Sequence, residues 1–217
     1  MPDYAARRRA MVDSQVRPSD VTSFPIISAM LAVPREVFVP AQLREAAYMG
    51  EHLDLGRGRV ILDPRTLAKM LDALDIRPGD LVLDIGCALG YSSAVMARLA
   101  GAVVALESDA DMAAEARAHL AEQEADNVIP HEGPLTEGAA EHGPFDVIIV
   151  EGGVAELPDA LTGQLKDGGR MACLFMEDRL GAVRIGHKTG GHVSWRFAFN
   201  ASAPVLPGFE RHMTFSL

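Results

Sequence analysis

The stretch from Asp80 to Glu107 constrains the fold most, because it places two apolar runs on either side of a glycine-rich turn and a helical segment. The runs at 81–85 and 102–106 are short and almost wholly apolar, as buried parallel strands are. Between them, residues 92–100 carry apolar side chains at helical spacing. An acid about 20 residues beyond a strand, turn and helix is typical of nucleotide-binding α/β folds.

This unit also predicts a ligand site. Gly86 and Gly90 allow backbone N–H groups to approach a ligand closely, and the Glu107 carboxylate can accept both hydroxyls of a ribose. The alternative is a packed strand–helix–strand unit that binds nothing, but the joint placement of these residues with Asp84 favours a nucleoside-type cofactor. Cys87 is interpreted as a small residue packed under that cofactor, since no histidine lies near it in sequence to activate a nucleophile.

The glycine spacing indicates which cofactor. Residues 84–90 read D-I-G-C-A-L-G, which lacks the G-x-G-x-x-G of dinucleotide sites. The pattern resembles the first motif of class I S-adenosylmethionine (SAM) methyltransferases, E/D-x-G-x-G-x-G, with Ala88 in place of the middle glycine. A nicotinamide-dependent dehydrogenase is therefore the disfavoured alternative.

The composition of the chain limits the kinds of partner and the cellular location that we expect. The net charge of −10 over 217 residues argues against a general nucleic-acid surface. No apolar run approaches the ~20 residues of a membrane helix, and no signal peptide is evident, so we expect neither a membrane nor an exported location. Two cysteines suit a reducing cytoplasm. The seven histidines show no metal-ligand spacing, so the sequence predicts no metal, and it leaves the oligomeric state open.

The chain is expected to form a single domain over 1–217, with a helical N-terminal cap over 1–75 that leans on the cofactor site and an α/β core over 76–217. In the cap, the sequence predicts helices over 2–16, 26–31 and 64–74, an extended piece over 33–40 and a flexible loop over 56–59. Asp63 or Pro64 is expected to begin the third of these helices.

The core is predicted to be a Rossmann-like, mostly parallel twisted sheet with helices on both faces and antiparallel C-terminal strands. Further strands are expected over 128–130, 145–150 and 170–175, helices over 110–124 and 155–165, a hairpin over 183–200 and a last short strand over 213–217. Glu107, Glu132 and Glu151 each follow a predicted strand, so one sheet would bring all three to the same rim.

Four further stretches together resemble the protein-L-isoaspartate O-methyltransferase family. Residues 11–17, M-V-D-S-Q-V-R, are similar to its M-V-x-x-Q-L, and residues 29–40, A-M-L-A-V-P-R-E-V-F-V-P, to its A-M-x-x-V-P-R-x-x-F-V-P. The second stretch is specific, because ordinary SAM methyltransferases lack it. F-D-V-I-I-V at 145–150 and Q-L-K-D-G-G-R at 164–170 resemble later motifs of the family.

The resemblance implies a cytoplasmic class I methyltransferase that transfers a methyl group from SAM to the free carboxylate of an isoaspartyl residue, leaving S-adenosylhomocysteine. Glu107 would hold the ribose, Glu132 would lie near the adenine, and Asp84 would lie at the methionine end. The resemblance and the turn and strand-end positions together give one set of predicted cofactor-binding residues. They are Asp84, Gly86, Cys87, Gly90, Tyr91, Glu107, Ser108, Glu132, Gly133 and Glu151.

The chain departs from the family at the substrate motif I-S-x-P, which here is I-L-D-P at 61–64. Leu62 replaces the substrate-binding serine, Asp63 adds a negative charge beside it, and Arg65 stands where a histidine is often found. These three residues define the expected substrate region, and no catalytic residue is assigned. The departure leaves open an altered substrate, or a non-catalytic relative that binds SAM as a sensing or interaction module.

Overall fold

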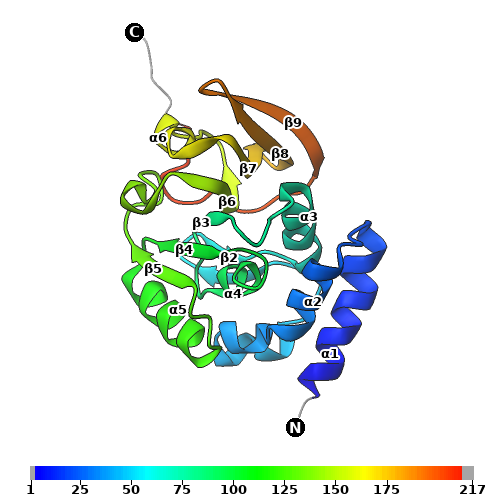
Figure 1. Ribbon diagram of the computed structural model, residues 1–217. Helices are drawn as coiled ribbons and strands as arrows, with labels where there is room; N and C mark the ends of the chain where they lie inside the picture. The colour runs from blue at the N-terminus through cyan, green and yellow to red at the C-terminus, as the bar shows by residue number, and fades with distance from the viewer. Residues whose placement is uncertain (1–2, 212–217) are drawn as a thin grey trace.

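The computed structural model describes residues 3–211 and has a seven-stranded sheet at its centre (Figure 1). The strand order is β5-β4-β3-β6-β7-β8-β9; the first five strands are parallel and the last two are antiparallel. This confirms the predicted fold class. The strands are β3 (Leu81–Ile85), β4 (Ala102–Glu107), β5 (Val128–Glu132), β6 (Phe145–Val154), β7 (Leu165–Glu177), β8 (Leu180–Thr189) and β9 (His192–Asn200).

Both faces of the central strands β3, β4 and β6 are buried, which explains why these strands read as apolar runs rather than as alternating patterns. Val82 and Val147 face one core cluster, whereas the adjacent residues Leu83 and Ile148 face another. Side chains alternate along a strand, so consecutive apolar residues supply the two cores in turn.

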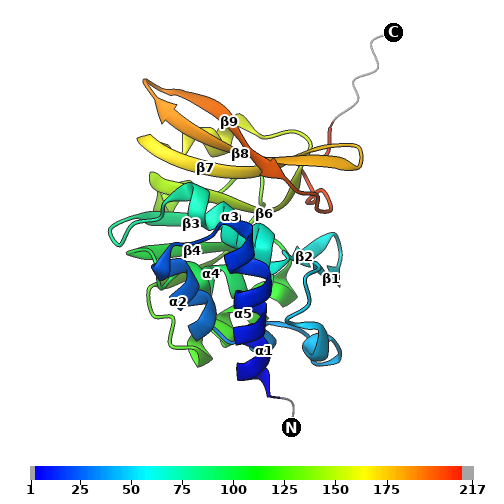
Figure 2. The same cartoon turned by 90° about the vertical axis from the view of Figure 1, so that its right-hand side faces the viewer.

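Helices cover the first face and mostly irregular segments cover the second (Figure 2). The first face packs against α1 (Tyr4–Met11), α2 (Phe24–Ala32), α3 (Pro64–Leu74), α4 (Tyr91–Met96) and α5 (Ala110–Glu122). The second face packs against α6 (Asp159–Gly163) and apolar side chains of 203–209. Within the described part of the chain, no helix has the length and hydropathy to cross a membrane.

Two predictions in the N-terminal region are wrong. The piece at 33–40 is not extended throughout, because Arg35–Phe38 forms a 3-10 turn (η3) in which Val37 N–H donates to the Pro34 carbonyl at 3.0 Å. Proline restricts its own φ and the residue before it, and neither restriction prevents such a turn. The expected loop at 56–59 is instead the tight end of a hairpin, β1 (Leu53–Gly56) and β2 (Arg59–Ile61), joined by residues with positive φ. Strands this short give no readable period.

Two differences appear in the C-terminal half. The helix expected over 155–165 is only α6, because the N–H groups of Ala155 and Glu156 donate to the Phe209 carbonyl instead of starting a helix. The glycine-containing stretch 166–169, which the sequence pattern marks as a turn before the strand expected at 170–175, lies within β7, whose pairing with β6 is irregular there. The hairpin around Gly190 is confirmed by β8 and β9, and the expected strand over 213–217 lies outside the described residues.

Candidate functional site

The candidate site lies at the carboxyl ends of β3, β4 and β6, beneath the β1–β2 hairpin. The chain enters the sheet at β3, builds outward through β4 and β5, and returns to the other side of β3 as β6. Ligands of open α/β sheets bind at this reversal of strand order. The predicted residues Asp84, Glu107 and Glu151 lie on the three strands that meet here.

The glycine turn has the backbone geometry that a close-packed ligand site requires. Gly86 has φ +78°, and a Cβ there would lie 3.2 Å from a methyl carbon of Leu206. Ala88, where the SAM motif has its middle glycine, has φ +49°, a conformation in which a Cβ is unfavourable. Its N–H compensates by donating to Glu107 Oε2 at 3.0 Å. The positive φ explains why the family pattern has glycine at this position, and Ala88 adopts a strained backbone conformation here.

Asp84 is completely buried, and only one of its two carboxylate oxygens accepts hydrogen bonds within the described residues. Its Oδ2 accepts the hydroxyl protons of Ser92 at 2.7 Å and Ser93 at 2.5 Å, both at the start of α4. Its Oδ1 has no hydrogen-bond partner within residues 3–211. Burial raises the pKa of Asp84, the two hydroxyls partly oppose that rise, and the charge of Glu107 adds to it.

Glu107 is also buried, but all of its acceptor positions are taken. Oε1 accepts the backbone N–H groups of Ser108 at 2.7 Å and Asp109 at 3.0 Å, and Oε2 accepts that of Ala88. Arg59 of β2 adds Nε and Nη2, each 3.0 Å from Oε1, and its side chain is only 3% exposed. A carboxylate offers about four lone-pair sites, so Glu107 has none free for a ribose while Arg59 is in place.

Glu151 brings a second unsatisfied carboxylate to the same place. It is 4% exposed, and its Oε1 is unpartnered within the described chain. Burial, and next the charge of Asp84, raise the pKa of Glu151 well above its usual range. The cavity beside it is only about 10 Å³, room for about one water. It is lined by Val60, Ile61, Leu62, Leu67, Gly86, Cys87, Ala88, Tyr91, Ser92 and Glu151.

The expected substrate residues have separate roles. Leu62 is buried and lines this cavity. Asp63 begins α3, accepting the N–H of Thr66 at 2.9 Å, and its other oxygen lies 3.4 Å from His52 Nδ1. Its charge is therefore engaged at the helix start. Arg65 is exposed on α3.

The remaining predicted cofactor residues divide between the cavity and the rim. Cys87 and Tyr91 are buried beside the cavity, and burial raises the pKa of the Cys87 thiol well above its usual value, so a reactive thiolate is disfavoured. Glu132 is exposed and lies opposite Glu107 in the β4–β5 register, next to Gly133.

Sequence reasoning missed two arginines. Arg59 pairs with Glu107 across 48 residues of sequence, a partnership that no local pattern reveals. Arg35 is completely buried, donates to the carbonyls of Ala47 and Leu62 at 2.7 Å, and lies 4.7 Å from the Tyr91 ring centre. In the sequence, the one sign that Arg35 is buried is its place between apolar residues in the stretch 29–40.

Comparison with known proteins agrees with this geometry. The family model of protein-L-isoaspartate(D-aspartate) O-methyltransferase matches residues 6–195. A protein-L-isoaspartate O-methyltransferase of Koribacter versatilis (strain Ellin345) is 36% identical over 190 residues, which is 88% of this chain and 86% of that protein.

Solved structures give the same result. A protein-L-isoaspartate O-methyltransferase superposes with a TM-score of 0.82 at 26% identity, covering 93% of this chain and 66% of that one. A Plasmodium falciparum protein assigned to the same activity, solved with S-adenosyl-L-homocysteine, has a TM-score of 0.79 over 95% of this chain and 99% of its own. At 20% identity, the latter supports the fold alone.

Proposed function

The chain belongs to the protein-L-isoaspartate O-methyltransferase family, and we propose that it transfers a methyl group from SAM to the free carboxylate of isoaspartyl residues in proteins. The chemistry that SAM supplies is a methyl group on a sulfonium, which leaves as the thioether S-adenosylhomocysteine. The methyl carbon's bond to sulfur breaks as its bond to the substrate oxygen forms, and the product is a methyl ester.

The observation that carries this proposal is the pair of unpartnered carboxylate oxygens around the glycine turn. Asp84 Oδ1 and Glu151 Oε1 are buried without a hydrogen-bond partner within residues 3–211. Buried carboxylates are costly unless a cation or donors approach them. SAM carries both a sulfonium and an ammonium, so it suits this acidic pocket. The pyrophosphate of a nicotinamide dinucleotide would be repelled there.

Each residue of the site would have a simple task. The turn from Gly86 to Gly90 would let the cofactor approach the backbone, with Asp84 at its amino acid end. Glu107 would accept the ribose hydroxyls, and Glu132 at the rim would lie near the adenine. The attacking carboxylate needs no base, so the protein's contribution is alignment of oxygen, methyl and sulfur with exclusion of water.

The site must open before it can act. The cavity of about 10 Å³ is far smaller than the cofactor, and Arg59 fills the acceptor positions of Glu107. Both obstacles belong to the β1–β2 hairpin, which is also tied to the start of α5 by Arg57, 2.5 Å from Asp109 Oδ2. We therefore infer that cofactor binding requires this hairpin to move and Arg59 to release Glu107.

The decisive experiment is transfer of a labelled methyl group from SAM to an isoaspartyl peptide, with the normal aspartyl peptide as control. Incorporation into the isoaspartyl peptide alone is the expected result. Calorimetric titration of SAM completes the test, with Glu151→Gln compared with Glu156→Gln, which changes an exposed acid in the connection that follows β6.

We expect Glu151→Gln to weaken SAM binding ~10-fold, equivalent to ~1.4 kcal/mol of charge attraction, and Glu156→Gln to leave it unchanged. No saturable SAM binding in folded protein would overturn the cofactor assignment. Tight SAM binding without incorporation would instead mean that the substrate differs, as Leu62 in place of the family serine would allow, or that the chain is the non-catalytic module.

A further inference from the structure

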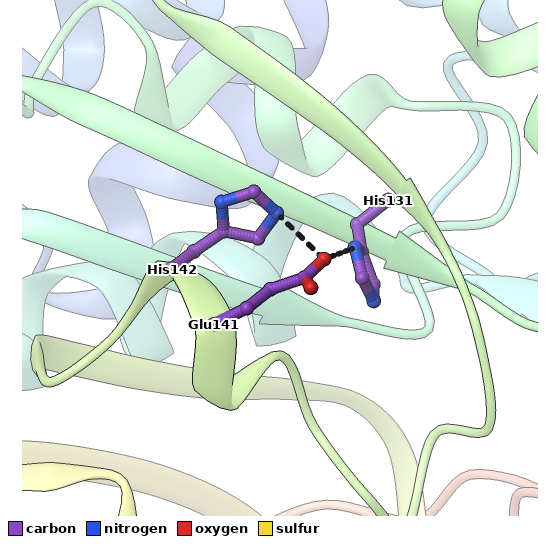
Figure 3. Close-up of side chains that lie close together, drawn as sticks. All are labelled: His131, Glu141 and His142. Carbon is purple, nitrogen blue, oxygen red and sulfur yellow. Dashed lines mark ion pairs between the residues drawn. The ribbon is translucent and has the colours of Figure 1, made fainter.

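A second group of ligand-type side chains lies on the edge of the sheet. His131 is on β5, the outermost parallel strand, and Glu141 and His142 are on η5 (Ala140–His142), a 3-10 turn in the connection to β6. Figure 3 shows both imidazole rings directed at the carboxylate of Glu141. The methyl-transfer chemistry proposed above gives this group no role.

The distances within the group are those of ligands around a common centre. His131 Nδ1 lies 3.4 Å and His142 Nε2 lies 3.5 Å from the same atom, Glu141 Oε1. Both distances exceed the 2.7–3.2 Å of an ordinary N–H···O bond. Ligand atoms ~2.0–2.1 Å from a tetrahedral Zn²⁺ lie ~3.3–3.4 Å from one another. All three ligand atoms lie within 4.8 Å of one another, so a small local adjustment would complete the set.

We propose that His131, Glu141 and His142 form a site for a divalent transition-metal ion of the zinc class. Two imidazoles and one carboxylate suit Zn²⁺, Co²⁺ and Ni²⁺, whereas Mg²⁺ and Ca²⁺ prefer an all-oxygen set. Three protein ligands leave a fourth position for water. The side chains of the histidines are 21% and 29% exposed and that of Glu141 is 70% exposed, so an ion reaches the site from solvent without rearrangement of the core.

The metal would join the end of β5 to the β5–β6 connection. His131 is followed directly by Glu132, the residue proposed to lie near the adenine, and Glu141 and His142 lie in the β5–β6 connection. Coordination would fix this connection against the end of β5. Both rings approach the same oxygen of Glu141 at more than the usual hydrogen-bond distance, and they meet edge to face at 5.2 Å between ring centres.

The test uses untagged full-length protein titrated with ZnCl₂ by calorimetry, and with CoCl₂ by absorption spectroscopy. We expect one equivalent to bind, with a tetrahedral Co²⁺ spectrum and no thiolate-to-metal charge-transfer band, because both cysteines are buried elsewhere. Zn²⁺ should raise the midpoint of thermal unfolding. Binding should weaken at pH values low enough to protonate the histidines.

Three variants locate the site. His131→Gln and His142→Gln should weaken Zn²⁺ binding by at least the ~10–100-fold that loss of a supporting partner costs. Glu141→Gln changes a mostly exposed side chain, so it tests the site without endangering the fold. His192→Gln, which changes an exposed histidine on β9, is the matched control and should bind as the wild type does. Saturation only at millimolar zinc, or equal affinity in Glu141→Gln and wild type, would overturn the proposal.

Discussion

Replacing Arg59 by methionine separates the two roles that we propose for this arginine, support of the fold and obstruction of the cofactor site. Methionine keeps much of the length and apolar stem of the side chain but has no donor. Arg59 and Glu107 are 3% and 1% exposed as side chains, and two nitrogens of the guanidinium contact the carboxylate. The substitution therefore removes a desolvated, two-pronged ion pair.

The cost to stability follows from what remains around Glu107. Breaking a buried ion pair by removing one partner typically costs ~3–5 kcal/mol, because a charge is left uncompensated. Here three backbone N–H groups still donate to Glu107, from Ala88, Ser108 and Asp109. These donors partly offset the loss of the arginine. We therefore expect the free energy of unfolding to fall by ~3 kcal/mol, the lower end of the range.

The effect on cofactor affinity should have the opposite sign. The apparent dissociation constant of a ligand equals its intrinsic value divided by the fraction of protein in the binding-competent state. In the closed form Arg59 contacts Glu107, and in the open form it does not. If half or more of the ~3 kcal/mol is lost from the closed form alone, the fraction of open, binding-competent protein rises ~10–100-fold, since each 1.4 kcal/mol is a factor of ten. Arg59→Met should thus bind S-adenosylhomocysteine ~10–100-fold more tightly than the wild type.

The assay pairs calorimetric titration of S-adenosylhomocysteine with denaturant unfolding, for wild type, Arg59→Met and Arg57→Met. Arg57 belongs to the same hairpin, but its side chain is 62% exposed and its partners are Asp109 and Asp111 at the surface. Its loss should change either quantity little, because ion pairs of exposed side chains contribute little to stability. Weaker or unchanged binding in folded Arg59→Met would refute the competition argument and make Arg59 part of the binding surface.

Four further predictions concern Asp84, Leu62 and Asp63. Burial raises the pKa of Asp84 from 3.8 to about 6, so the folded protein binds this proton more tightly than the unfolded chain does. The contribution of Asp84 to the free energy of unfolding should therefore fall as pH rises from about 4 to about 6. Asp84→Asn should abolish that slope in pH-dependent denaturation. SAM affinity should rise over the same interval, because the ionised carboxylate attracts the cation. Leu62→Ser should lower the free energy of unfolding by ~2–5 kcal/mol and raise methyl incorporation into an isoaspartyl peptide; unchanged incorporation would show that Leu62 does not limit the reaction. Asp63→Ala should cost ~1 kcal/mol by removing the acceptor at the start of α3, and denaturant unfolding with no measurable loss would contradict that role.

The sequence was sufficient for the sheet but not for the short pieces that cover it. Strands buried on both faces are apolar at every position, so β3, β4 and β6 could be recognised one by one. The 3-10 turn at Arg35 and the hairpin around Arg57 are only a few residues long, and tertiary contacts determine them. The shortening of α6 has the same origin, since the Phe209 carbonyl takes the N–H groups of Ala155 and Glu156.

Residues on regular strands could be assigned to the site, whereas their partners could not. Glu107 and Glu151 were predicted to follow strands and Asp84 to lie within one. In the structure Glu151 lines the cavity, and Asp84 is close enough for its charge to raise the pKa of Glu151. Their burial and unpaired oxygens depend on packing and have no mark in the sequence. The metal-ligand group was missed for a related reason, because His131 and His142 are 11 positions apart and match no spacing motif.

Arg59 shows why a conserved-looking cofactor motif does not by itself define an open cofactor site. The strand–turn–helix–strand unit brings Glu107 to the position where a ribose is expected, and three backbone amides orient its carboxylate. Those same features make the carboxylate an excellent partner for any cation that the covering hairpin presents. Arg59 is that cation, and it pairs with the buried carboxylate of Glu107 in the closed form. Binding must therefore exchange one set of donors for another at Glu107, so affinity depends on the difference between them rather than on the motif alone.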